Sequence, residues 1–328
     1  MMNQKQFRHV VCAGLLVWLV GVSGIQAAAK EKPVAVAEVP RVTYHTTAVD
    51  GVKIFYRESG SPANPTIVLL HGFPSSSHMY RELIPRLASR YHVIAPDYPG
   101  FGNSDAPSVD DFAYTFDHLA AIMDDFLDSI QVTRYSIYIQ DYGSPIGFRL
   151  ATKHPEKIQA IITQNGNAYD EGLTPFWAEN LKPFWDHRNA ENEAKLRGLL
   201  TLEGTKFQYT KGIRSETNVS PDSWTTDQAG LDRPGNQEIQ LALFYDYRNN
   251  LALYPSWHQY LRDRQPPVLI VWGKNDPIFG PEGAKAFLRD VPSAELHLLD
   301  TGHFALEEDS QPIAEYILAF LKKAGVKK

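Results

Sequence analysis

Short runs of β-branched and aromatic residues alternate with amphipathic helical segments, and this alternation restricts the fold of the 328-residue chain more than any other feature. Strands are expected at 42–47, 52–56, 66–70, 92–95, 135–139, 158–163, 267–272 and 295–299. Helices are expected between or after them, at 79–88, 116–130, 144–153, 282–289 and 313–322. Strands joined by helices predict an α/β fold with a mostly parallel central sheet flanked by helices.

The alternation is interrupted between about residues 166 and 264. Here Trp, Phe and Tyr are frequent, polar helical stretches appear, and β-branched runs are missing. We therefore predict one α/β core domain made of residues 40–166 and 265–328, with a helical cap, residues 167–264, inserted into it.

The first 29 residues are expected to form a secretory signal peptide outside the fold. Lys5 and Arg8 precede an apolar run at 10–25, which is followed by small residues at 27–29. The run is shorter than the roughly 20 apolar residues that span a bilayer, so an uncleaved anchor is the less favoured alternative. We predict a bacterial protein that is exported to the periplasm or secreted, and that is free of the membrane once the signal is removed.

Charge and motif content favour a small-molecule partner. The net charge is −6, the isoelectric point is about 6.0, and the basic residues are scattered, so no surface for nucleic acid is indicated. The histidines form no tight ligand pair, and the glycine loops lack the spacing that binds dinucleotides. No metal or other cofactor is therefore expected, and the oligomeric state stays open.

Five short motifs fall at the ends of expected strands, where ligands gather in open α/β sheets. They are Leu-His-Gly-Phe-Pro at 70–74, Asp-Tyr-Pro-Gly-Phe-Gly at 97–102, Gln-Asp-Tyr-Gly at 140–143, Trp-Gly-Lys-Asn-Asp-Pro at 272–277 and Thr-Gly-His-Phe at 301–304. In order and placement they resemble the α/β-hydrolase fold family, in which the chain order is nucleophile, acid, histidine. The resemblance implies these site residues: nucleophile Asp141, acid Asp276, base His303, and an oxyanion hole formed by the N–H groups of Phe73 and Tyr142.

The nucleophile is expected at a sharp turn between strand and helix, which requires small neighbours. Gly143 meets this requirement, whereas Ile139 departs from it. Ser144 is the rival nucleophile, but it would place Tyr142 and Ile146 at the positions of the small residues. Asp141 is therefore the preferred nucleophile.

An aspartate at this position resembles the branch that contains epoxide hydrolases and haloalkane or haloacid dehalogenases. A carboxylate is already anionic at neutral pH and can attack an sp³ carbon, which forms an alkyl-enzyme ester. His303, oriented by Asp276, would then activate a water that hydrolyses this ester.

Epoxide hydrolysis is the function that we predict from these motifs. The segment 244–249 resembles the cap segment that carries a proton-donating tyrosine in epoxide hydrolases, which indicates Tyr247. His71, expected at the substrate pocket, belongs to the epoxide-hydrolase form of its motif. A second tyrosine is not identified, and Tyr169 or Tyr209 could take its place only in a rearranged cap.

Dehalogenation is the main alternative. The Trp that often follows the nucleophile in dehalogenases is replaced by Tyr142, and an Asn of their halide site by Phe73. Trp177 and Trp185 could instead donate indole N–H groups to a halide. The cap aromatics together predict an apolar pocket and a small apolar organic substrate. An esterase, a lactonase or a non-catalytic ligand-binding member of the fold remain further alternatives.

Overall fold

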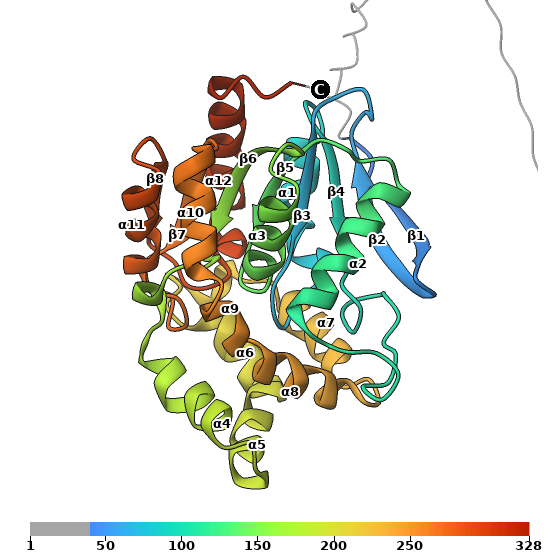
Figure 1. Cartoon of the computed structure of the whole chain (residues 1–328), viewed down its shortest axis with the longest axis vertical. Coiled ribbons are helices and arrows are strands. Elements are labelled where there is room, and N and C mark those ends of the chain that lie inside the picture. The colour runs from blue at the N-terminus through green and yellow to red at the C-terminus, as the bar shows by residue number, and fades with distance from the viewer. Residues whose placement is uncertain (1–39, 328) are drawn as a thin grey trace, which may run out of the picture. The chain divides into compact units, whose positions relative to one another are not determined.

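The computed structural model describes residues 40–327, so the predicted signal peptide lies outside the described residues. One sheet of eight strands in the order β1-β2-β4-β3-β5-β6-β7-β8 forms the centre of the fold (Figure 1). Pairing is antiparallel at β1–β2 and β2–β4 and parallel elsewhere. The strands are β1 (Thr43–Val49), β2 (Val52–Ser59), β3 (Thr66–Leu70), β4 (His92–Pro96), β5 (Tyr135–Ile139), β6 (Ile158–Gln164), β7 (Val268–Gly273) and β8 (Glu295–Leu299). The predicted α/β fold is confirmed.

Helices cover both faces of this sheet. On one face lie α1 (Leu83–Leu87) and α12 (Ala305–Lys323), and on the other lie α2 (Phe116–Ser129), α3 (Gly143–Lys153), α10 (Tyr254–Arg264) and α11 (Pro281–Asp290). Side chains of β3 alternate between the two layers. Ile67 and Leu69 join the apolar cluster beneath α1 and α12, while Val68 and Leu70 join the cluster beneath α2 and α3. Burial on both faces explains why the strands read as nearly continuous apolar runs.

The named elements between β6 and β7 are all helical, and most of them form a layer at the carboxyl ends of the parallel strands (Figure 1). This layer contains α4 (Lys182–Asp186), α5 (Ala190–Arg197), α6 (Leu202–Thr210), α7 (Pro221–Leu231), α8 (Asn236–Asp246) and α9 (Arg248–Leu251). The last helix of the insertion, α10, packs instead against α3 and α11, and its Trp257 stacks on Phe148 with ring centroids 5.2 Å apart. Helix α10, which the prediction assigns to the cap, thus packs with helices of the core.

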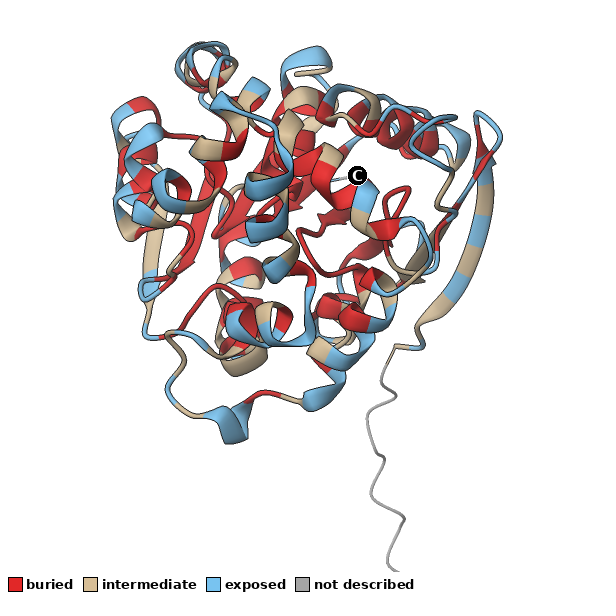
Figure 2. Cartoon of the chain, turned by 90° about the horizontal axis from the view of Figure 1, so that it is seen from below, coloured by how far each residue is buried: buried red, intermediate tan, exposed pale blue. Residues whose placement is uncertain are grey.

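Burial follows this layering. Buried residues run through the interior, and exposed residues lie on the outer sides of the helices (Figure 2). Strand β1 lies at the edge of the sheet and alternates between half-buried and exposed residues. Among the residues that the structure describes, no helix has the length and apolar character that crossing a membrane requires.

A sharp turn between β5 and α3 holds Asp141. Its φ angle of 47° lies in the left-handed region, which non-glycine residues rarely adopt. Gly143 is required because a Cβ there would lie 2.0 Å from the carbonyl oxygen of Leu70. Gly72 is required in the same way, since its Cβ would lie 2.2 Å from that of Asp141. Two backbone segments, the end of β3 with its loop and the turn after β5, thus meet at this carboxylate.

The departure at Ile139 is accommodated by a residue of α3. A Cβ on Gly147 would lie 2.5 Å from Cγ2 of Ile139, so the missing side chain of Gly147 makes room for the isoleucine. The small residue that this turn requires is therefore Gly147 of the helix, and the strand can carry the larger Ile139.

This complementarity predicts non-additive stability changes. Gly147→Ala should destabilise the fold by about 1–3 kcal/mol through overpacking, and Ile139→Ala by about 2–5 kcal/mol through cavity formation. In the double variant the new methyl group enters the vacated space, so the loss should be smaller than the sum. Urea unfolding of the four proteins measures this coupling, and strictly additive losses would contradict it.

Candidate active site

The carboxylate of Asp141 is held asymmetrically. Its Oδ1 accepts hydrogen bonds from the backbone N–H groups of Phe73, at 2.8 Å, and Tyr142, at 2.6 Å. Its Oδ2 lies 3.8 Å from Nε2 of His303. Two preorganised donors are therefore aimed at one oxygen, and the other oxygen is left for reaction.

The structure brings His303 and Asp276 together from the ends of β8 and β7. Both side chains are fully buried, and Nδ1 of His303 lies 2.8 Å from Oδ2 of Asp276. When Nδ1–H donates to this carboxylate, Nε2 carries the electron pair, which accepts a hydrogen bond from Nε2 of Gln140, and Nε2 lies 3.8 Å from Oδ2 of Asp141. The residues assigned as nucleophile, acid and base thus form one connected constellation.

Three polar residues that sequence reasoning missed support this constellation. Asn165 donates through Nδ2 to Oδ2 of Asp276, at 2.7 Å. Gln164 donates through Nε2 to the backbone oxygen of His303, at 2.8 Å, and the Nε2 atoms of Gln140 and His303 lie 2.9 Å apart. All three lie at the carboxyl ends of β5 and β6, and this position was the only signal of a role that the sequence carried.

Electrostatics tune the two titrating groups. Burial raises the pKa of Asp141 to about 6, although the charge of His303 and the two backbone hydrogen bonds oppose this shift. Burial alone would lower the pKa of His303, but the charge and hydrogen bond of Asp276, together with the charge of Asp141, raise it above its ordinary value. Esterification of Asp141 would remove its charge and so lower the pKa of His303, which makes the imidazole a free base when it is needed.

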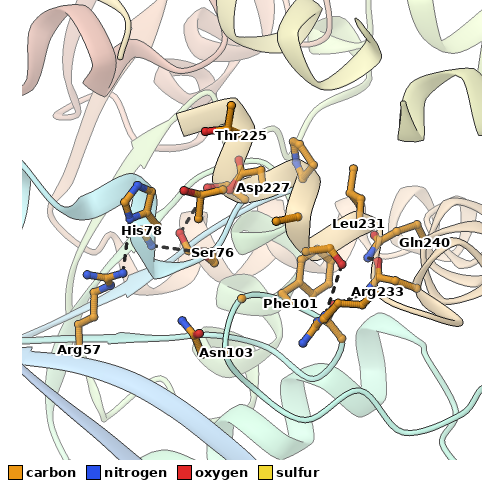
Figure 3. A pocket seen from close by; sticks show the side chains of 18 residues that line it. Arg57, Ser76, His78, Phe101, Asn103, Thr225, Asp227, Leu231, Arg233 and Gln240 are labelled. Atoms are coloured by element: carbon orange, nitrogen blue, oxygen red, sulfur yellow. Dashed lines mark hydrogen bonds between the residues drawn. The ribbon is translucent and has the colours of Figure 1, made fainter. Parts of the chain in front are cut away.

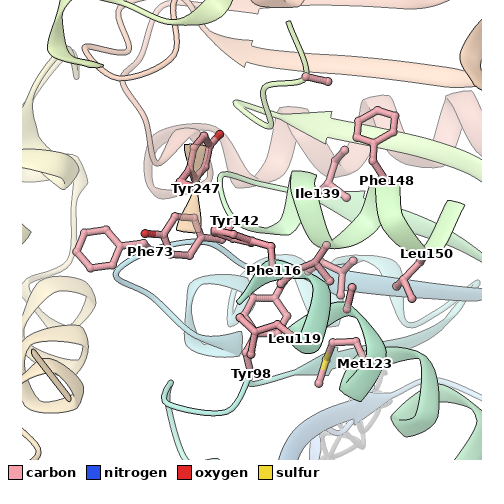
Figure 4. Close-up of a cluster of buried hydrophobic side chains, with 14 of the residues drawn as sticks. Phe73, Tyr98, Phe116, Leu119, Met123, Ile139, Tyr142, Phe148, Leu150 and Tyr247 are labelled. Atoms are coloured by element: carbon pink, nitrogen blue, oxygen red, sulfur yellow. The ribbon is translucent and has the colours of Figure 1, made fainter. Parts of the chain in front are cut away.

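An apolar pocket lies against Asp141 between core and cap. Aromatic and aliphatic side chains form most of its wall, and no basic side chain is among its lining residues. It is lined by Phe73, Asp141, Tyr142, Phe176, Trp177, Leu181, Leu199, Phe207, Gln208, Phe244, Tyr247 and Ile278. Phe73, Tyr142 and Tyr247 gather at one end of the buried cluster drawn in Figure 4.

The indole N–H groups of the two tryptophans considered as halide donors already donate hydrogen bonds to backbone oxygens. Trp177 lines the pocket, but its Nε1 donates to the backbone oxygen of Ile278, at 2.8 Å. Trp185 does not line the pocket, and its Nε1 donates to the backbone oxygen of Phe244, at 2.7 Å. The pocket position predicted for Trp185 is wrong, because this ring lies behind Tyr247, with the two rings nearly parallel and their centroids 6.4 Å apart.

His71 also lies elsewhere than predicted. It is fully buried, stacks on the ring of Tyr98 with centroids 4.1 Å apart, and is absent from the pocket lining. Its Nδ1 donates to the oxygen of Gly72, at 3.0 Å, and its Nε2 accepts from the N–H of Tyr98, at 3.3 Å. Burial lowers the pKa of His71 to about 3, so a neutral ring supports the Phe73 loop from behind.

Tyr247 lies in the pocket wall as predicted, but neither suggested partner joins it. The hydroxyl of Tyr169 donates to Asp290, at 2.8 Å, and the hydroxyl of Tyr209 donates to Asp227. The Tyr247 hydroxyl is hydrogen-bonded to Tyr254 instead. Burial, first among several causes, raises the pKa of Tyr247 well above its ordinary value, so the phenol is neutral.

A second cavity, of about 480 Å³, contains none of the assigned catalytic residues (Figure 3). Polar side chains are numerous in its wall, among them Arg57, His78, Asp227 and Arg233. The loop that follows β3 divides the two cavities, because Phe73 lines the first while Pro74 and Ser75 line the second. The chemistry of the Asp141 carboxylate therefore belongs to the apolar pocket alone.

Comparison with known proteins now places the chain. Residues 65–310 match the model of the α/β hydrolase fold family. The chain is an α/β hydrolase. It is 46% identical over 274 residues to "Uncharacterized hydrolase YNR064C" of Saccharomyces cerevisiae, a match that covers 82% of this chain and 93% of the relative. It is 28% identical over 304 residues to a haloalkane dehalogenase of Mycobacterium marinum, with coverages of 90% and 95%.

Solved structures agree with this α/β hydrolase in fold. Cfl2 from Burkholderia cenocepacia superposes with a TM-score of 0.72 at 24% identity, covering 85% of this chain and 95% of that one. Haloalkane dehalogenase DbeA from Bradyrhizobium elkani superposes with a TM-score of 0.70 at 21% identity, with coverages of 87% and 99%. The family resemblance inferred from the motifs is confirmed, and its relatives are of the dehalogenase type.

The contact between Asp276 and His303 predicts a measurable titration shift. Asp276→Asn removes the charge that raises the pKa of His303, so this pKa should fall by about 1–3 units. Titration of the imidazole signals by NMR measures it. Asp309→Asn, which alters a carboxylate paired with Arg214, is the matched control and should leave the His303 signals in place. An unchanged pKa in Asp276→Asn would contradict the assigned pair.

Proposed function

We propose that this α/β hydrolase cleaves a carbon–heteroatom bond at an sp³ carbon of a small apolar substrate through an ester at Asp141. The observation that carries the proposal is the position of this carboxylate. One oxygen is held by two backbone N–H groups, and the other lies beside Nε2 of His303 in an apolar pocket. A carboxylate so placed is suited to displacement at carbon, whereas acyl transfer uses an activated hydroxyl or thiol.

Two steps follow from this arrangement. Oδ2 of Asp141 attacks the carbon, a C–O bond forms, and the carbon–heteroatom bond breaks with its electron pair on the leaving group. His303 then takes a proton from water at Nε2, and the hydroxide attacks Cγ of Asp141. The oxyanion that develops on Oδ1 is stabilised by the N–H groups of Phe73 and Tyr142, a contribution of about 3 kcal/mol per donor in other enzymes. Collapse passes the proton from His303 to the departing alkoxide and leaves Asp141 as a carboxylic acid, which then loses its proton to solvent and becomes a carboxylate again.

A halide is the leaving group that the comparisons support best. Relatives at 27–29% identity over most of the chain are named haloalkane dehalogenases, while none of the relatives considered is named an epoxide hydrolase. The pocket is lined by apolar groups without a basic side chain, which favours a neutral haloalkane over a charged haloacid. We therefore place carbon–halogen cleavage ahead of the epoxide hydrolysis predicted from the motifs.

Epoxide hydrolysis remains the second candidate because of one residue. The phenol of Tyr247 lines the pocket and is kept neutral by its raised pKa, so it could protonate the oxygen of an opening epoxide. The indoles of Trp177 and Trp185 are bound to backbone oxygens and do not form a halide site.

Product analysis decides between these candidates. Purified protein is incubated with 1-bromobutane and with styrene oxide, and bromide and diol are quantified. Bromide release is the expected result, and diol without bromide would reverse the order of the two candidates. Neither product from a broad panel of both substrate classes would overturn the proposed reaction.

Trapping of the intermediate tests the role of His303. The variant His303→Gln should still be alkylated but should hydrolyse the ester slowly, so intact mass spectrometry should show a covalent adduct on Asp141. Asp141→Ala is the control and should show neither adduct nor turnover. Full turnover by Asp141→Ala would refute the scheme.

The raised pKa of Asp141 predicts the pH dependence of alkylation. Only the ionised carboxylate attacks, so the single-turnover rate of adduct formation should be half-maximal near pH 6 and fall about tenfold per pH unit below it. Rapid quenching followed by intact mass measures this rate. In His303→Gln the charge that lowers the pKa of Asp141 is gone, so the midpoint should move to higher pH. A flat profile between pH 5 and pH 8 would contradict this assignment.

A further inference from the structure

Most hydrogen-bond donors around the active-site pocket already donate to other groups of the protein. The N–H groups of Phe73 and Tyr142 donate to Asp141, and the indole of Trp177 donates to Ile278. The hydroxyl of Tyr247 is bonded to Tyr254. None of these groups is free to stabilise a charge that appears on a leaving group.

Two polar side chains in the pocket wall are exceptions. Gln208 is 4% exposed, and its side-chain amide makes no hydrogen bond to any residue that the structure describes. The hydroxyl of Tyr142 is buried and has no partner within the described part of the chain. Buried polar groups are nearly always paired in folded proteins, so the unpaired hydroxyl of Tyr142 requires an explanation. The amide of Gln208 is not among the fully buried atoms, and it is a polar group without a partner in a mostly apolar pocket wall.

Local packing holds Gln208 in this position. The next residue of α6, Tyr209, stacks on Phe304 with centroids 3.9 Å apart and donates to the buried Asp227. The preceding residue, Phe207, also lines the pocket. Tyr209 is thus anchored, and Gln208 beside it lies in the pocket wall without a bond of its own to hold it. An aliphatic residue would suit the surrounding Leu181 and Leu199 better, so packing does not account for an amide here.

We propose that the amide of Gln208 and the hydroxyl of Tyr142 form the site that receives the leaving group. The inference rests on the proposed function and adds the halide-binding residues that the motifs did not reveal. As Oδ2 of Asp141 attacks, the electron pair of the breaking bond goes to the halogen. The resulting halide accepts hydrogen bonds from Nε2–H of Gln208 and Oη–H of Tyr142, and no proton is transferred.

The chemistry of an amide favours a halide over an epoxide oxygen at this site. An epoxide oxygen that becomes an alkoxide needs a proton, and a carboxamide does not give one up at working pH. A halide needs only donors. The pair would serve an epoxide only if Tyr142 or Tyr247 supplied the proton.

Bromide binding and alkylation test the proposal with three variants. Gln208→Leu removes the amide at similar volume, and Tyr142→Phe removes the hydroxyl while keeping the backbone N–H. Gln240→Leu is the control, because Gln240 is a fully buried glutamine of α8 that lines the other cavity. Bromide affinity is read from tryptophan fluorescence, since Trp177 lines the pocket, and alkylation by 1-bromobutane is read from the single-turnover rate.

We expect Gln208→Leu and Tyr142→Phe each to weaken bromide binding and slow alkylation by about tenfold, with Gln240→Leu unchanged in both. Gln208→Leu should also unfold at the same or a higher temperature, since it loses no hydrogen bond. A glutamine with a purely structural role would not combine retained stability with lost binding.

Wild-type affinity and rate in Gln208→Leu would overturn the proposal. Absence of an adduct from His303→Gln, together with absence of product from the wild-type protein, would instead refute the proposed function, and the bromide titration would still test the site.

Discussion

The close approach of two backbone segments at Asp141 is the constraint on which the active site depends. Gly143 lets the turn after β5 come against the oxygen of Leu70, and Gly72 lets the loop after β3 come against Asp141 itself. The parallel pairing of Leu70 with Ile139 sets the two strand ends level, so the N–H groups of Phe73 and Tyr142 reach the same carboxylate oxygen. The positive φ of Asp141 costs free energy, which the surrounding core offsets.

The cap surrounds this reactive carboxylate with apolar groups and leaves few polar ones. Trp177 and Trp185 donate to backbone oxygens, and Tyr169 and Tyr209 donate to buried carboxylates. An apolar wall strengthens the electrostatic interactions of Asp141 and limits access of water. In the proposed reaction the leaving group would be received by Gln208 and Tyr142, the polar side chains of this wall for which the described residues offer no hydrogen-bond partner.

Predictions from sequence succeeded where they depended on the hydrophobic pattern of a segment or on the position of a residue at the end of a strand. All eight strands were predicted within a few residues of their observed bounds. Strands that are buried on both faces of a sheet form nearly continuous apolar runs, which are easily recognised in a sequence. The relative placement of Asp141, Asp276 and His303 followed from the rule that parallel strands end at one edge of a sheet. The predictions for His71 and Trp185 were wrong, because they required the direction of a side chain, which a motif does not encode.

By itself the sequence determined the α/β fold, the chain order of the residues assigned as nucleophile, acid and base, and the acidic side chain at the first of these positions. These properties depend on local periodicity and on the chemistry of single residues. Only the tertiary structure decided which donors are free. The sequence does not show whether the N–H or O–H group of a Trp, Tyr or Gln side chain donates to a backbone oxygen or lies unpaired at a pocket. That difference arises from contacts between residues far apart in the chain. For that reason Trp177 and Trp185 were considered as donors from the sequence, while Gln208 was found only in the folded protein.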